Sequence, residues 1–460
     1  MGLLIKGGEI VTADARYVAD IYAEGETITA IGHDLEVPPG TEVVDATGKY
    51  VFPGFIDPHT HIYLPFMGTY AKDTYDTATT AALCGGTTTL IDFCIPEVNE
   101  DPWSAVDTWT SKSEGQANMD YTWHMAVTRY DDKVGEALRE IVRDRGISSF
   151  KVFLAYKGAL GIDDASLFST LSLAKELGVI TTAHCENADV VLELQKAFVD
   201  AGKLGPEFHE PSRPAWVEAE GTSHFAFMLR ATGASGYVVH LSNEDALRRA
   251  TEAKLQGVDI YVETLIQYLL LDNTYAELPD FEGAKYVMSP PLREKRNQNV
   301  LWAALQAGVI NTLATDHAPF DTVQKQMGKD NFCLIPNGIP SLEDRVRMAW
   351  THGVATGRLD IHRFVDSCST AAAKIFGLFP RKGTIALGSD ADLVVYDPDW
   401  EGAISVETHH MNMDYNPFEG WPVKGRCAAV TVRGQVQVVD GEFTGQKGIG
   451  RFIKREPQHF

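Results

Sequence analysis

The chain has 460 residues, of which 44% are hydrophobic and 22% charged, and its formal net charge is -23 at pH 7. These proportions are those of an ordinary globular protein that is long enough for one large domain and a smaller one. The strong negative charge argues against nucleic acid and against anionic membranes, since both need clustered Lys and Arg, so we expect neither as a partner.

The two ends of the chain share one texture. Residues 2–50 alternate short β-like runs with turns, and the same alternation returns after residue 383. Period-two runs bounded by glycine-containing turns are typical of strands. We therefore predict one small β-domain, of β-sandwich type, assembled from residues 1–52 and 380–444.

Residues 53–379 have a different pattern, in which short apolar, β-branched runs alternate with amphipathic stretches of helical period. Eight runs are visible: VFPGFID, TTTLIDF, YTWHMAV, SSFKVFLAY, VITTAHC, SGYVVHL, DIYVETL and INTLATD. Several of the helical stretches between them end on glycine, the usual C-terminal stop. The pattern predicts an α/β fold class, a (β/α)8 TIM barrel with residues 341–376 as added helices, beside the smaller β-sandwich domain.

The first run, expected as a buried strand over residues 51–56, leads through a proline turn into His59-Thr60-His61. On an extended backbone, residues two apart point the same way, so both imidazoles can face one point, as a metal site requires. The pair has little meaning alone. Its value depends on further ligands elsewhere in the chain.

Such residues follow the other runs. Lys151 and Tyr156 lie in the fourth run, His184 ends the fifth, His240 the sixth and Asp316 the eighth. Each is more often a packing residue when taken singly. In a TIM barrel, however, the chemistry lies at the C-terminal ends of the strands, so together these positions predict a metal site.

Lys151 stands in an apolar run, where an ammonium is costly to bury. It could pair with Asp316 or Glu186, or reach to the barrel mouth. Alternatively, burial lowers its pKa, and the neutral amine takes up carbon dioxide to become a carbamate that bridges two metal ions. The carbamate, Asp316 and a hydroxide would nearly balance two divalent ions, whereas an ammonium would leave a large positive excess.

The motifs HTH, FKVFLAYK, AHCEN, VHLSN, MSPPLR and ATDHAPF resemble those of the hydantoinase and dihydropyrimidinase branch of the cyclic amidohydrolases, over essentially the whole chain. The resemblance implies two zinc ions per subunit, bridged by N6-carboxylated Lys151 and a hydroxide. By motif position, one zinc would be held by His59, His61, Lys151 and Asp316. The other would be held by Lys151, His184 and His240.

The same resemblance implies hydrolytic ring opening of cyclic amides by the bridging hydroxide. The substrates would be 5-monosubstituted hydantoins, or dihydropyrimidines, and the products N-carbamoyl amino acids. Asp316 would move a proton to the departing ring nitrogen, and the Tyr156 hydroxyl would stabilise the carbonyl oxygen. Tyr156, Ser289 and Asn337 would bind the substrate, the last two through backbone groups.

The substrate class depends partly on what is missing. Tyr63 stands where dihydroorotase-like sequences typically have an arginine, and YLPFMGT stands where allantoinase-like sequences usually have an Asn-Glu-Pro-type segment. A neutral ring with an apolar substituent fits better. The segment VETLIQYLLL departs from the expected Cys-Pro-Gln-Tyr, which leaves an L-selective bacterial hydantoinase open beside a D-selective one. Candidates for the substituent pocket, with core packing as the alternative, are Phe66, Met67, Phe153, Leu154 and Leu160.

Two other functions stay open: a catalytically inactive dihydropyrimidinase-like scaffold, and an allantoinase- or dihydroorotase-type enzyme. An inactive relative would have lost metal ligands, and this chain retains every candidate. The resemblance also implies a homotetramer or homodimer, with residues 445–460 as a subunit contact. His409 and His410 are expected at the surface or in packing.

The six cysteines are scattered and form no C-x-x-C pair, which is typical of free thiols in a reducing compartment. Lys6 and Glu9 interrupt the apolar N-terminal stretch. We therefore predict a cytoplasmic protein.

Overall fold

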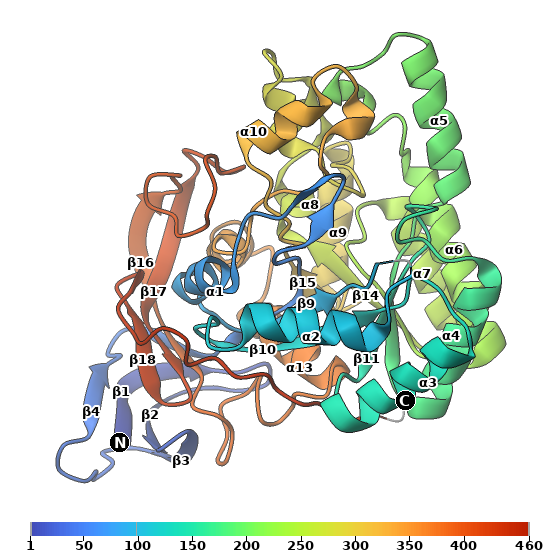
Figure 1. Cartoon of the computed structure of the whole chain (residues 1–460). Helices are drawn as coiled ribbons and strands as arrows, with labels where there is room; N and C mark the ends of the chain where they lie inside the picture. Colours follow the sequence, from blue (N-terminus) through green and yellow to red (C-terminus); the bar gives the residue numbers. More distant parts are fainter. Residues whose placement is uncertain (1, 98, 459–460) are drawn as a thin grey trace.

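The computed structural model describes residues 2–97 and 99–458. Figure 1 shows a barrel of strands surrounded by helices, with a second sheet beside it that combines the first strands of the chain, in blue, with the last, in red. Within residues 2–97 and 99–458, none of the helices combines the length and the apolar character needed to traverse a bilayer.

The barrel has eight parallel strands that are neighbours in chain order, so the predicted α/β barrel is confirmed. A backbone bridge between Thr60 and His317, with the His61 N–H donating to the His317 carbonyl at 2.8 Å, joins the last strand to the first. Helices cover the outside, which is why the strands read as continuous apolar runs. The strands are β6 (Phe55–Thr60), β9 (Thr87–Cys94), β10 (Asp120–Ala126), β11 (Ser149–Phe153), β12 (Ile180–His184), β13 (Gly236–Val238), β14 (Ile260–Leu265) and β15 (Thr312–Ala314).

The first run differs from its prediction. Residues 50–53 form β5 (Tyr50–Pro53), which belongs to the second sheet, and β6 starts only at Phe55. Strand β6 then continues through Pro58 to Thr60 instead of turning at the proline. His59 is therefore the last residue but one of strand β6, and its side chain is fully buried.

The helices alternate with the strands as the periodicity predicts. Helix α4, for example, begins after Asp163, whose side chain accepts from the Ser166 N–H at 2.8 Å, and ends at Gly178 in the left-handed conformation. The main helices are α1 (Tyr75–Cys84), α2 (Pro102–Ser113), α3 (Asp132–Glu140), α4 (Asp164–Leu177), α5 (Ala188–Asp200), α6 (Ala215–Thr232), α7 (Glu244–Leu255) and α9 (Arg296–Gln306). Short helices follow in the predicted added segment: α11 (Arg345–Ala349), α12 (Ile361–Val365) and α13 (Ala371–Ile375).

The second sheet forms a separate domain from both ends of the chain, as predicted, and its nine strands are joined in one continuous hydrogen-bonded network. The reason lies in β1 (Gly2–Val11), whose first half pairs with β4 (Glu42–Asp45) and whose second half pairs with β5. A bulge between Ile5 and Gly8 bends the strand between these two partners. The remaining strands are β2 (Arg16–Glu24), β3 (Thr27–Gly32), β16 (Leu393–Ala403), β17 (Pro422–Val432), β18 (Gln435–Val439) and β19 (Glu442–Phe443).

The C-terminal tail packs on its own barrel. The Tyr121 N–H donates to the Arg451 carbonyl at 3.0 Å, and the Ile453 N–H donates to the Tyr121 carbonyl at 2.7 Å. Arg455 is fully buried, and its guanidinium donates to the Ser149 hydroxyl at 2.9 Å. A contact between this tail and a neighbouring subunit stays a prediction, and residues 459–460 lie outside the described residues.

Candidate metal centre and active site

Three of the predicted ligands meet where the first and last barrel strands close the ring. His59 and His61 come from the end of β6, and Asp316 follows β15. The Nε2 atoms of both histidines lie 3.1 Å from Asp316 Oδ1. One ligand atom from each of the three residues lies within 4.8 Å of the others, and all three residues are buried.

A second group lies beside the first. Nδ1 of His184, at the end of β12, is 2.9 Å from Nε2 of His240, which follows β13. The His240 ring stacks on the His59 ring with their centroids 5.4 Å apart, so the two groups are in contact. Lys151, His61, His184, His240 and Asp316 all line one cavity.

The surroundings of His59 fit a metal ion. Nδ1 of His59 lies 2.7 Å from Oε1 of Glu263, which orients the other ring nitrogen toward Asp316. Burial lowers the pKa of His59, but the charges of Glu263 and Asp316 raise it to about 9. The proton on His59 Nε2 faces Asp316 Oδ1 at 3.1 Å. Without this proton, two atoms that can only accept a hydrogen bond would face each other. A metal ion would take the place of this proton.

Lys151 is the buried amine that the sequence singles out. Its side chain is 0% exposed, and its Nζ lies 4.8 Å and 4.9 Å from the ring centroids of Phe93 and Phe153. Nζ has no hydrogen-bond partner among the described residues. Burial lowers the pKa of Lys151 to about 8, against the raising effect of the Asp316 charge. An amine of this kind is partly neutral near neutral pH, as carboxylation by carbon dioxide requires.

The two simpler explanations of Lys151 are wrong. It does not reach solvent, and its amine makes no ion pair within the described part of the chain. Glu186, one of the suggested partners, instead accepts from Arg213 at 2.7 Å and lies 2.8 Å from His184 Nε2. That contact leaves the His184 Nδ1 lone pair free to face His240.

The three predicted substrate residues line the same cavity. The Asn337 side-chain amide donates to the Ser289 hydroxyl at 3.0 Å. The Tyr156 ring lies against the His184 ring, with centroids 5.2 Å apart. Tyr156, His240 and Asp316 all have positive φ values, and non-glycine residues in this region cluster at functional sites.

Three of the five candidates for the substituent pocket line the cavity, and their role toward a substituent stays a prediction. Phe66, Phe153 and Leu160 line the cavity, and Phe66 meets the Tyr156 ring edge-on at 5.4 Å. Met67 instead lines an adjoining hollow. Leu154 packs against the core and is not among the residues that line the cavity.

Glu263 is a residue of the candidate centre that sequence reasoning missed. Its buried carboxylate accepts from the Tyr237 hydroxyl and from the His240 N–H, each at 2.8 Å, and lies 2.7 Å from His59 Nδ1. One carboxylate therefore touches both halves of the candidate centre. An acid inside the apolar run DIYVETL was the available signal.

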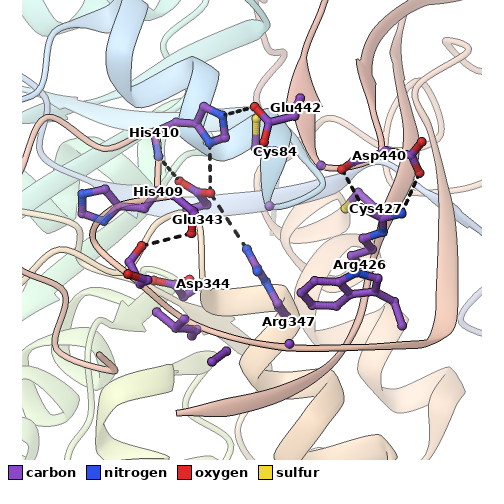
Figure 2. Close-up of a pocket in the computed structure, with 18 of the residues that line it drawn as sticks. Cys84, Glu343, Asp344, Arg347, His409, His410, Arg426, Cys427, Asp440 and Glu442 are labelled. Carbon is purple, nitrogen blue, oxygen red and sulfur yellow. Dashed lines mark hydrogen bonds and ion pairs between the residues drawn. The ribbon is translucent and has the colours of Figure 1, made fainter. Parts of the chain in front are cut away.

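Another hollow lies between the second sheet and the barrel (Figure 2). Its charged residues are paired with one another: His410 Nδ1 lies 3.1 Å from Glu343, and Arg426 donates to Asp440 at 2.9 Å. His409 lies 3.1 Å from a backbone carbonyl. Both histidines are thus bonded within the fold, as expected. The unpaired ligand atoms converge on the cavity at the barrel mouth and not on this hollow.

A parallel barrel whose strand ends bring imidazoles, a carboxylate and a buried amine into one cavity defines the class of barrel hydrolases that work with metal ions. Residues 50–437 match the model of the Amidohydrolase family, and the chain belongs to this family.

Individual relatives are similar over the full length. The chain is 48% identical to a D-hydantoinase from Geobacillus stearothermophilus, over 99% of this chain and 97% of the relative. It is 64% identical to the solved D-hydantoinase (dihydropyrimidinase) from a Thermus species, with a TM-score of 0.98 and 100% of both chains covered. A solved L-hydantoinase from Arthrobacter aurescens is more distant, at 28% identity and a TM-score of 0.89, with 98% of this chain and 99% of that chain covered.

Proposed function

We propose that the protein is a cyclic amidohydrolase that opens 5-monosubstituted hydantoins, and also dihydropyrimidines, to N-carbamoyl amino acids. The observation that carries this proposal is that five of the six candidate ligands line one cavity together with the candidate substrate residues, and that the sixth, His59, lies 3.1 Å behind Asp316. An inactive scaffold has no need for such a set, and the names of the relatives point to the same reaction.

We propose that the cavity holds two zinc ions, one bound by His59, His61, Lys151 and Asp316 and the other by Lys151, His184 and His240. Lys151 would be carboxylated and would contribute to both. Bound there, the ions would supply a hydroxide nucleophile at neutral pH and polarise the substrate carbonyl. The unpartnered Lys151 amine and the facing acceptors of His59 and Asp316 support this assignment.

Asp316 is the proton carrier in this proposal. Burial raises its pKa, but the neighbouring His59 and His61 hold it well below the usual value, so the group is a carboxylate. It can take the proton of the attacking water and pass it to the ring nitrogen that leaves. Burial raises the pKa of Tyr156, so its hydroxyl keeps its proton and can donate to the carbonyl oxygen as negative charge develops.

Ring recognition falls to the segments that contain Ser289 and Asn337, and the substituent falls to Phe66, Phe153 and Leu160. We propose a preference for the D enantiomer, because the D-hydantoinases resemble this chain more closely than the L-hydantoinase does. The departure at VETLIQYLLL, which left an L-selective enzyme open, includes the second half of β14 and the α8 helix (Ile266–Leu270), whose residues do not line the cavity.

The test is a rate panel on protein loaded with zinc. It compares both enantiomers of an aryl- and an alkyl-hydantoin with dihydrouracil, allantoin and dihydroorotate. We expect the D-hydantoins to have the highest kcat/KM and Asp316→Asn, the control for contaminating hydrolases, to be inactive. If dihydroorotate or allantoin were the best substrate, the assignment to the hydantoinase branch would be wrong.

We also propose that the protein works in the cytoplasm as a homotetramer or homodimer. All six cysteines are free, which is typical of a reducing compartment. Trp216 and Phe227 on α6 are 54% and 69% exposed, as expected of a helix that packs on another subunit. Light scattering coupled to gel filtration would give the mass in solution, and a monomer would contradict the proposal.

A further inference from the structure

Lys325 is a second buried lysine, outside the candidate metal centre. It ends the short helix α10 (Thr322–Lys325) and is 1% exposed. Its Nζ donates to three backbone carbonyls: Val287 at 2.9 Å, Pro336 at 2.7 Å and Gly338 at 2.8 Å. Each proton of the ammonium therefore has its own acceptor.

This arrangement is unusual for a buried cation, which ordinarily pairs with a carboxylate. Burial lowers the pKa of Lys325 well below its usual value, and no carboxylate is hydrogen-bonded to it in the described part of the chain. Three carbonyl oxygens at hydrogen-bond distance nevertheless require three protons, which only the ammonium carries. The charge is therefore compensated by the dipoles of these three carbonyls. Their hydrogen bonds to the ammonium fix the direction in which each carbonyl points.

These carbonyls belong to the two segments on which the candidate substrate residues lie. Val287 precedes Ser289 by two residues, and the other two carbonyls are those on either side of Asn337. The segments are also joined directly, because the Gly338 N–H donates to the Val287 carbonyl at 3.0 Å. Lys325 thus stands behind both segments, while Ser289, Asn337 and Gly338 line the cavity in front.

The contacts also bear on the Asn337 backbone. In a trans peptide group the N–H and the C=O point in opposite directions. Because the Pro336 carbonyl accepts from Lys325 at 2.7 Å, the Asn337 N–H of the same peptide group points away from Lys325. A buried ammonium behind the segment also polarises these groups toward whatever binds in front of them.

We propose that Lys325 is a positioning residue for the ring of the substrate: its ammonium fixes the backbone around Ser289 and Asn337 in the orientation that binds a cyclic imide or ureide. The inference rests on the proposed function, and it concerns binding of the ring and not the bond-breaking step.

The test compares Lys325→Met, which keeps the length of the side chain and removes its donors, with Lys329→Met as a control at an exposed lysine of the same region. Both are measured as zinc-loaded protein for metal content, for the fraction folded and for kcat and KM on a hydantoin and on dihydrouracil. For Lys325→Met we expect KM to rise about tenfold or more on both substrates. Metal content and kcat should change far less, and the control should match the unmodified protein.

A purely structural role gives a different pattern, in which the folded fraction and kcat fall together while KM is unchanged. That result would overturn the inference. If Lys325→Met does not fold, Lys325→Gln, whose amide keeps two N–H donors, replaces it and should show a smaller rise in KM. If the unmodified protein opens no cyclic amide, the proposed function fails, whereas an active protein with unchanged KM in both variants refutes only the role of Lys325.

Discussion

Replacing Lys151 by methionine should abolish activity and yet stabilise the metal-free protein. The amine is fully buried between two phenyl rings without a hydrogen-bond partner among the described residues. Burial lowers its pKa from 10.5 to about 8, in spite of the nearby carboxylates, which corresponds to about 3 kcal/mol of folding free energy lost when the amine is charged. Methionine has a similar length and carries no charge, so we expect the free energy of unfolding to rise by about this amount.

The pH dependence follows from the direction of the shift. The pKa of Lys151 is lowered on folding, so between about 8 and 10.5 the unfolded chain binds a proton that the folded protein does not. Stability of the unmodified metal-free protein therefore increases with pH across this window. The advantage of Lys151→Met should be constant below about pH 8 and shrink as the pH rises toward 10.5.

The assay is urea unfolding of protein whose metal has been removed with a chelator. It is done in bicarbonate-free buffer, at pH values below and within this window. Lys157→Met is the matched control. Lys157 lies in the loop that follows β11, the strand that contains Lys151. It is exposed, and its ammonium pairs with Asp189 at 2.7 Å. We expect the control to change stability by less than about 0.5 kcal/mol. A Lys151→Met protein that is no more stable than the unmodified one, or that retains full activity, would refute the reasoning.

Three further substitutions test other parts of the structure. Glu263→Gln should weaken metal binding about 10- to 100-fold, measured by competition with a chelator, because Glu263 orients His59; unchanged affinity would contradict that role. Phe66→Ala should raise KM about tenfold for an aryl-hydantoin and leave dihydrouracil, which has no substituent, unaffected, since Phe66 lines the cavity; equal effects on both would count against a substituent pocket. Arg455→Met should lower the free energy of unfolding by about 3 kcal/mol with KM unchanged, because the substitution leaves two buried carbonyls without a donor. A melting temperature equal to that of the unmodified protein would show that the tail does not stabilise the barrel.

The barrel could be predicted from the sequence because each strand is a short β-branched run and each helix an amphipathic stretch with a glycine stop. The error in the first run also has a physical reason. VFPGFID is continuous in hydrophobicity, but Gly54 divides it between two sheets, and a division of this kind leaves no trace in the pattern. The separate β-domain was predictable from the strand pattern that both ends of the chain share, whereas the bulge that bends β1 between its partners was not.

The candidate site was predictable as far as its residues lie at strand ends. Five of the six candidate ligands lie at or just after strand ends, and Lys151, in the middle of β11, was recognised as a charged residue in an apolar run. The five are His59, His61, His184, His240 and Asp316. Glu263 and Lys325 were not predicted, because their roles depend on which backbone and imidazole atoms surround them. Those neighbours come from segments far away in the chain, and only the fold brings them together.

The central claim is that these side chains hold a pair of metal ions on which hydrolysis depends. The most direct measurement starts from protein whose metal has been removed with a chelator. It follows the rate of ring opening of a D-hydantoin as zinc is added back in known amounts. We expect no activity without metal and full activity at two ions per chain. Full activity in metal-free protein, or a maximal rate reached without any bound zinc, would contradict a metal-dependent hydrolysis.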